Sequence, residues 1–247
     1  MPTHPSTHES AVDRSAETRD RILDAAVREF SENGLAGART EQIAAAAGVN
    51  KALLYYYYES KDKLYAAALE MVSARVRDRS MAVFLREASA GERMLRAALD
   101  HFDRILTQRE FQSLMQQEMM RLHRGEEGQL PILVKRVFGP LYAMLQSMVR
   151  EGVESGELIE AEWLQMMLAT LGGNVFYFLS APVLRLVVAY EPFDREVLRA
   201  RRVSLVEFLG QAIFLDRKKG AELAAKVLAD TPMPESVEFK GFEEKSK

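Results

Sequence analysis

Helical spacing of apolar residues runs through almost the whole of this chain, and it is the sequence feature that most constrains the fold. From Arg14 to Asn33, the residues Ile22, Ala26 and Phe30 recur at the spacing of one helix face. Gly34 follows where such a helix can end, because glycine accepts a left-handed turn. Strand-type alternation is almost absent from the sequence. The sequence therefore predicts an all-α fold.

Two shorter helical segments follow this first helix. Thr40 can cap one that runs to Ala47, and Gly48 then ends it. The other begins after Asn50 and ends near Tyr58. Three helices with a glycine turn between the second and the third are the outline of a helix-turn-helix motif, whose last helix can enter the major groove of DNA.

Four consecutive tyrosines lie in the third segment, although tyrosine favours β-strands in most hosts. Leu54 and Tyr58 are four residues apart, so they face the core of a helical motif. Leu53 and Tyr56 point elsewhere. Tyr55 lies at the edge of the buried face, where a phenol can pack its ring and still reach a phosphate. The alternative is an aromatic cluster that serves only as core.

Residues 40–65 closely resemble the DNA-binding signature of the tetracycline-repressor (TetR) family of transcriptional regulators. That signature runs roughly Ile-Ala-x-x-Ala-Gly-Val-Ser-x-Gly-x-Leu-Tyr-x-Tyr-Phe-x-Ser-Lys-x-x-Leu. The matching residues are Ile43, Ala44, Ala47, Gly48, Val49, Leu54, Tyr55, Tyr57, Ser60, Lys61 and Leu64. The chain departs from the signature at three positions, with Asn50 for serine, Ala52 for glycine and Tyr58 for phenylalanine. The methyl group of Ala52 either fits against DNA or shifts the docking slightly.

The resemblance implies a set of DNA-contacting residues around the third helix. They are Arg39, Thr40, Asn50, Lys51, Ala52, Leu53, Tyr55, Tyr56 and Lys61. We expect Lys51, Lys61 and Tyr55 on phosphates. We expect Leu53 to make an apolar contact with a thymine methyl group. Because the net charge of the chain is −3, we expect a local basic patch rather than a broad one.

A homodimer is expected, because one helix-turn-helix reads few base pairs. Two reading helices about 34 Å apart, or a multiple of it, match a pseudo-palindromic operator. The resemblance implies that the last long helices, residues 161–190 and 194–215, are buried in a four-helix bundle between the two subunits. In the second of them apolar residues cover more of the circumference than the core of a monomer needs. The residues expected at this interface are Gly172, Gly173, Phe176, Val203, Val206, Leu209 and Ile213.

The resemblance also implies an effector cavity enclosed by helices at about residues 91–108, 110–124 and 130–155. These segments are rich in methionine, whose adaptable side chain suits apolar ligands. The residues expected to contact a small apolar or amphipathic effector are Phe102, Phe111, Met115, Met119, His123, Phe138, Tyr142, Asn174 and Tyr177. Ordinary core packing is the alternative for each methionine.

The sequence gives no support for a metal or cofactor site, an enzyme active site or a membrane span. His101 and His123 stand outside any metal-ligand spacing and the chain has no cysteine, so we expect no metal site and no cofactor. The sequence contains no glycine-rich phosphate loop, no nucleophile elbow and no paired-carboxylate signature, so we expect no catalytic residues and no enzyme. The apolar pieces of residues 163–190 are too short to span a membrane, and we expect a cytoplasmic protein.

Four parts are therefore expected along the chain. They are a disordered N-terminal tail at 1–13, a helix-turn-helix domain at 14–60, an effector-binding and dimerisation domain at 61–216 whose connecting helix is 61–88, and a C-terminal helix with a flexible tail at 217–247. The predicted function is a transcriptional repressor that a small ligand releases from its operator. Two alternatives stay open: a DNA-binding dimer that is constitutive or controlled by a protein partner, and a helical enzyme on a borrowed fold.

Overall fold

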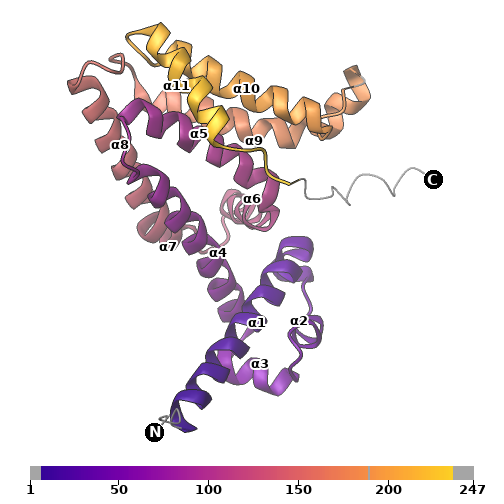
Figure 1. Ribbon diagram of the computed structural model, residues 1–247. Helices are drawn as coiled ribbons and strands as arrows, with labels where there is room; N and C mark the ends of the chain where they lie inside the picture. The colour runs from indigo at the N-terminus through magenta and orange to yellow at the C-terminus, as the bar shows by residue number, and fades with distance from the viewer. Residues whose placement is uncertain (1–6, 189, 236–247) are drawn as a thin grey trace, which may run out of the picture. The chain divides into compact units, whose positions relative to one another are not determined.

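The computed structural model describes residues 7–188 and 190–235, with side chains from residue 14 onward, and every regular element in them is a helix (Figure 1). The predicted all-α fold is confirmed. The described residues form two compact units. One unit holds the chain up to Arg77 together with Glu110–Phe138, and the other holds Asp78–Arg109 together with the chain from Gly139 onward.

The first unit contains the three helices that the sequence predicts near its start, with two segments from later in the chain. Its elements are α1 (Thr7–Gly37), α2 (Thr40–Ala46), α3 (Lys51–Tyr58), the first part of α4 (Lys61–Phe84), most of α6 (Arg109–His123), α7 (Leu130–Leu133) and the π-helix η1 (Val134–Phe138). The second unit contains the rest of α4, α5 (Ala90–Thr107), α8 (Gly139–Glu154), α9 (Trp163–Val188), α10 (Arg195–Ala212) and α11 (Arg217–Asp230).

The N-terminal boundary differs from the prediction. Since α1 begins at Thr7, residues 7–13 belong to a helix and not to a disordered tail. The remaining parts of the predicted tails, residues 1–6 and 236–247, lie outside the described residues. The division into four domains stays a prediction.

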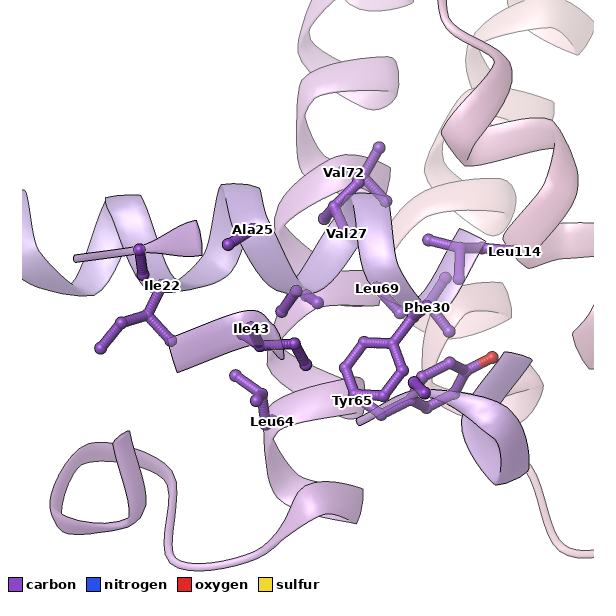
Figure 2. Close-up of a cluster of buried hydrophobic side chains, with 14 of the residues drawn as sticks. Ile22, Ala25, Val27, Phe30, Ile43, Leu64, Tyr65, Leu69, Val72 and Leu114 are labelled. Atoms are coloured by element: carbon purple, nitrogen blue, oxygen red, sulfur yellow. The ribbon is translucent and has the colours of Figure 1, made fainter. Parts of the chain in front are cut away.

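The core of the first unit is built from the helix faces that the sequence pattern indicates. Ile22 and Phe30 of α1 and Ile43 of α2 have no exposed surface. Leu54 of α3 is also fully buried. The rings of Phe30 and Tyr65, the latter from α4, meet edge to face with their centroids 5.1 Å apart (Figure 2). Burial of each such side chain stabilises the fold by about 1.5–3 kcal/mol, so α3 rests on a packed support.

Polar side chains of α6 complete this unit by binding the end of α1. Ser113 Oγ donates to the carbonyl oxygen of Ser31 at 2.6 Å, and Gln117 Nε2 donates to the carbonyl oxygens of Phe30 and Ser31 at 3.2 Å. The regular turns of α1 stop at Gly34, whose φ is +68°, where the sequence predicts the end of the helix. Carbonyl groups near a helix end lack partners within the helix, so α6 serves as their hydrogen-bond donor.

α5 is the central helix of the second unit, and α8, α9, α10 and α11 all pack against it. Leu95, Leu99 and Phe102 of α5 have no exposed surface. A bidentate ion pair joins α5 to α10, because Arg202 donates to both carboxylate oxygens of Asp103 at 2.8 and 2.9 Å. Both side chains are buried, and the paired geometry satisfies the charge of each.

α11 covers the face of α10 that carries several of the predicted dimer residues. Val206, Leu209 and Ile213 are each at most 5% exposed and share one core cluster with Ala224 and Val227 of α11. The prediction that Val206 and Leu209 of α10, and Ile213 directly after it, meet a second subunit is therefore wrong. Their apolar surface is already used within the chain.

Candidate nucleic-acid interface

α3 is set in place by the residues at its two ends. Asn50 caps its first turn, because the side-chain Oδ1 accepts a hydrogen bond from the amide of Leu53 at 2.7 Å. The helix spans Lys51–Tyr58, as the sequence predicts. It ends at Glu59, whose φ of +58° turns the chain towards α4. Asn50, predicted to contact DNA, thus has its amide oxygen engaged in capping.

α3 presents one exposed face. Tyr56 is 79% exposed, and Lys51 and Ala52 are exposed beside it. Leu53 and Tyr55 are half-buried at the edges of this face. These five residues, which we call the reading face, are all among those predicted to contact DNA. The helical spacing therefore sorts the tyrosine run as predicted.

The last two tyrosines of the run tie α3 to α1. Tyr58 donates to the carbonyl oxygen of Arg19 at 3.3 Å, and the hydroxyl of Tyr57 lies 3.2 Å from Ser15 Oγ. The guanidinium of Arg19 stacks over the Tyr57 ring, 5.4 Å from its centre. Burial raises the pKa of Tyr58, so its hydroxyl stays a hydrogen-bond donor. Sequence reasoning missed Arg19, which lies on the exposed side of the first helix.

Thr40 does not have its predicted role as a cap. The residue before α2 is Arg39, whose side chain makes no capping hydrogen bond and whose amide donates to Glu29 Oε1 at 2.9 Å. Thr40 is 6% exposed, and its hydroxyl lies 3.2 Å from that of Tyr55. The predicted cap is therefore wrong. Because Thr40 is buried, its hydroxyl contacts that of Tyr55 and not the solvent.

Glu41, on the first turn of α2, holds Lys51 of the reading face. The ammonium group of Lys51 donates to the carboxylate of Glu41 and lies 5.8 Å from the centre of the Tyr55 ring. This hydrogen bond lowers the pKa of Glu41 and raises the pKa of Lys51, so both side chains are charged at neutral pH. Sequence reasoning missed Glu41, because a separation of 10 residues from Lys51 matches no helical spacing.

Two other cations near α3, Lys61 and Lys63, are also held by oxygen atoms of the chain. Lys61 donates to the carbonyl oxygen of Ala36 at 3.1 Å, and Lys63 pairs with Glu59. Arg39 is exposed at the start of α2. A phosphate oxygen can replace each of these acceptors, which makes this a local basic patch of nearly balanced charge.

The predicted effector-contacting residues fall into both units. Phe111, Met115, Met119, His123 and Phe138 belong to the first unit, and Phe102, Tyr142, Asn174 and Tyr177 belong to the second. In the first unit, Met115 is buried in the core with Phe111 and Phe138 against it. Met119 and His123 are exposed, as is Tyr142 in the second unit. The residues that the sequence predicts around one effector therefore belong to separate groups of side chains.

Three of these residues come together in the second unit. The rings of Phe102 and Tyr177 lie with their centroids 5.6 Å apart. Asn174 is fully buried; its Nδ2 donates to a carbonyl oxygen of α5 at 3.1 Å and lies 3.3 Å from Nδ1 of His101. Burial, with the charge of Arg104, lowers the pKa of His101 to about 3, so its ring is neutral. Within residues 7–188 and 190–235, no group of three side chains is arranged to hold a metal ion.

α9 carries a stripe of exposed apolar side chains. Phe176 is 68% exposed, and Gly172 is exposed one turn before it. Gly173 and Val203, also predicted at a dimer interface, are partly covered within the chain. The stripe consists of Leu164, Leu168, Phe176, Leu179, Val183 and Leu186. By length and composition alone, α9 is also the one helix of the described residues that is apolar enough to cross a membrane, a weak criterion that core helices meet as well.

Comparison with known proteins places residues 22–68 in the sequence family described as bacterial regulatory proteins, tetR family. The HTH-type transcriptional repressor NicS of Pseudomonas putida is 30% identical over 139 residues, which are 56% of this chain and 65% of that protein. The match thus spans just under two thirds of this relative.

Two solved structures share the fold. One is a TetR family transcription regulator from Marinobacter aquaeolei VT8, with a TM-score of 0.60 and 23% identity over 82% of this chain and 98% of the other. The second is the transcriptional regulator FadR of Bacillus subtilis in complex with stearoyl-CoA, with a TM-score of 0.58 and 21% identity over 76% of this chain and 96% of the other.

Proposed function

We propose that the chain is a member of the TetR family of bacterial regulatory proteins and acts as a DNA-binding transcriptional repressor in the cytoplasm. The observation that carries this proposal is the reading face. It consists of exposed and half-buried residues of a short helix whose opposite side is fixed in a packed core. Tyr56, the most exposed tyrosine of the protein, lies on this face, whose surface is suited to the major groove.

The reading face and its surroundings divide the work of binding DNA. Lys51, Lys61 and Arg39 contact phosphates, which fix the position of the protein on the duplex. Ala52 and Tyr56 lie four residues apart on the exposed side of α3, so both reach base edges together. Their apolar atoms match thymine methyl groups, as does the side chain of Leu53. Tyr55 reaches a phosphate from the position that Thr40 gives it.

A second copy of the chain completes the repressor. The apolar stripe on α9 is too continuous to be left in water by a stable protein, and a two-fold partner carries the same stripe. Gly172 lies within the stripe where nothing in the described part of the chain would touch a Cβ, so a partner helix can approach closely there. Two reading faces then meet two half-sites of an inverted repeat.

A small apolar or amphipathic effector releases the repressor from DNA. Support comes from the partly exposed methionines of the second unit, from the buried polar side chain of Asn174 beside His101, and from the stearoyl-CoA held by a regulator of the same fold. The effector acts by preferring the conformation that does not fit the operator. A shift from 1:99 to 99:1 requires about 5.5 kcal/mol of differential affinity.

Selection of bound DNA from a random pool tests the DNA-binding part of this proposal. The full chain is expected to enrich an inverted repeat whose half-site centres lie about 34 Å apart or a multiple of it. Enrichment of no sequence would contradict the proposal. The effector part is tested separately, by thermal shift and operator release with a series of fatty acyl and aromatic compounds. A dimer that binds the operator but responds to none of them would be constitutive or controlled by a protein.

A further inference from the structure

Two consecutive residues of α2 hold two residues of the reading face. Thr40 meets the hydroxyl of Tyr55, and Glu41 meets the ammonium group of Lys51. Lys51 and Tyr55 are one turn apart on α3, so the two contacts lie side by side. The first contact is partly buried and positions a ring, whereas the second is exposed and joins two charges. The second contact has a consequence for DNA binding.

We propose that Glu41 is a specificity-determining residue, which holds Lys51 away from the phosphates of non-operator DNA and gives it up only in the operator complex. This inference rests on the proposed function. The partner of Lys51 in the free protein is a carboxylate, which carries the same charge as a DNA phosphate and, like it, accepts hydrogen bonds from an ammonium group. Any duplex must therefore displace Glu41 before Lys51 can bind a phosphate.

The ion pair of Lys51 and Glu41 is too exposed to have stabilisation of the fold as its main role. The side chains of Lys51 and Glu41 are 50% and 63% exposed. An ion pair so exposed contributes little to the free energy of folding, because water screens both charges. Its position matters more, since Lys51 is the first residue of the reading face and lies over the ring of Tyr55. A negative charge at this place also repels a phosphate backbone that passes close to it.

Operator and non-operator DNA differ in whether they can displace Glu41. Binding to non-operator DNA depends almost wholly on phosphate contacts, so nothing offsets the cost of breaking the pair. At the operator, the base contacts of Ala52 and Tyr56 draw α3 into the groove and bring a phosphate to Lys51. Glu41 thus lowers the affinity for competing sequences while the operator complex keeps its full set of contacts.

The salt dependence of DNA binding measures the transfer of Lys51 from Glu41 to a phosphate. Each phosphate contact contributes about 0.9 to the slope of log K against log salt concentration. Glu41→Gln keeps the shape of the side chain and removes its charge. We expect it to steepen the slope for a non-operator duplex by about 0.9 per subunit and to raise that affinity on the order of fivefold per subunit at physiological salt. The slope for the operator recovered by selection is expected to stay unchanged.

Lys51→Ala completes the test in a double-mutant cycle. In the unaltered background it is expected to flatten the operator slope by about 0.9 per subunit and to leave the non-operator slope unchanged. In the Glu41→Gln background it is expected to flatten both slopes. Glu32→Gln, which removes an exposed carboxylate of α1, is the control for net charge and is expected to change the two slopes equally.

Each result distinguishes this inference from the proposed function. A non-operator slope that Glu41→Gln leaves unchanged would overturn the inference while operator binding still stands. Loss of operator binding by Glu41→Gln would also overturn it, because Glu41 would then read a base, as carboxylates do with the amino group of cytosine. If the unaltered protein bound all duplexes alike, the proposed function itself would fall.

Discussion

The hydroxyl oxygens of Thr40 and Tyr55 lie 3.2 Å apart, and this contact joins the start of α2 to the reading face of α3. Thr40 is buried and Tyr55 is half-buried, so the contact is partly shielded from water. It fixes the direction of a tyrosine that we assign to a DNA phosphate. If the reading face binds DNA as proposed, this contact orients Tyr55 beforehand and reduces the entropy lost on binding.

Removal of either hydroxyl tests this preparation. Tyr55→Phe and Thr40→Val are each expected to lower the free energy of unfolding by about 0.5–1.5 kcal/mol, because a partly buried hydrogen bond is lost. The double variant is expected to lose little more than either single variant, since both remove the same contact. Urea unfolding of the four proteins measures this. Strictly additive losses would show that the two hydroxyls do not interact.

Tyr56 is expected to matter for DNA and not for the fold. Because its side chain is 79% exposed, Tyr56→Ala is expected to change the free energy of unfolding by no more than about 0.5 kcal/mol. Operator affinity is expected to fall about tenfold or more, as when one base contact is lost. Fluorescence anisotropy with a labelled operator measures the loss. Leu122→Ala, an exposed truncation on α6, is the matched control and is expected to bind normally.

Phe176 is expected to lie at the centre of the dimer interface. Phe176→Arg places a charge in the apolar stripe of α9, so we expect monomers in sedimentation equilibrium. Operator affinity is expected to fall with dimerisation, because a single reading face contacts only one half-site. Leu85→Arg puts the same charge at another exposed apolar position and is expected to leave the dimer intact. A Phe176→Arg protein that remained dimeric would place the interface elsewhere.

His101 is expected to make the second unit sensitive to acid. The unfolded chain binds a proton at a histidine near pH 6.5, whereas burial lowers the pKa of His101 in the folded chain to about 3. Between these values the unfolded state holds more protons, so stability falls as the pH falls, by up to about 1.4 kcal/mol per pH unit. His101→Gln is expected to lack this component. His123→Gln makes the same exchange at an exposed position and is the control; parallel curves for all three proteins would contradict the assignment.

Two glycines let α10 and α11 approach closely. A Cβ at Gly220 would overlap the carbonyl oxygen of Gly210, and backbone cannot move away as a flexible side chain can. We therefore expect Gly220→Ala to lower the free energy of unfolding by about 1–3 kcal/mol. Gly37→Ala, where a Cβ would meet only ordinary contacts, is the control. Equal melting temperatures for the two variants would contradict this account of the helix pair.

Local signals were enough to predict the reading helix. Asn50 has the side chain of a cap, and the spacing of Leu54 from its neighbours sets which side is buried. For that reason both the bounds of α3 and the exposure of Tyr56 are as predicted. The contacts of Thr40 and Glu41 were not predictable in this way, because they depend on the angle at which α2 packs against α3. That angle is set by tertiary contacts between residues far apart in sequence.

The surface of α10 shows a second limit of reading one helix at a time. Apolar residues over much of its circumference indicate a covered helix, but they do not say what covers it. The sequence prediction was that a second subunit covers Val206, Leu209 and Ile213, whereas α5 and α11 of the same chain cover them. The close approach at Gly210 and Gly220, which allows this packing, has no signal in the periodicity of either helix.

The exposed face of α3 lies against operator DNA in the proposed complex, so a thiol placed on this face is expected to become inaccessible when the operator binds. The chain contains no cysteine, so Ala52→Cys introduces a single reactive group at the centre of the reading face. We predict that saturating operator duplex protects this thiol from alkylation and that a scrambled duplex at the same concentration does not. A thiol at position 122, from Leu122→Cys, is predicted to react equally under both conditions. Full reactivity of Ala52→Cys in a saturated operator complex would contradict the account.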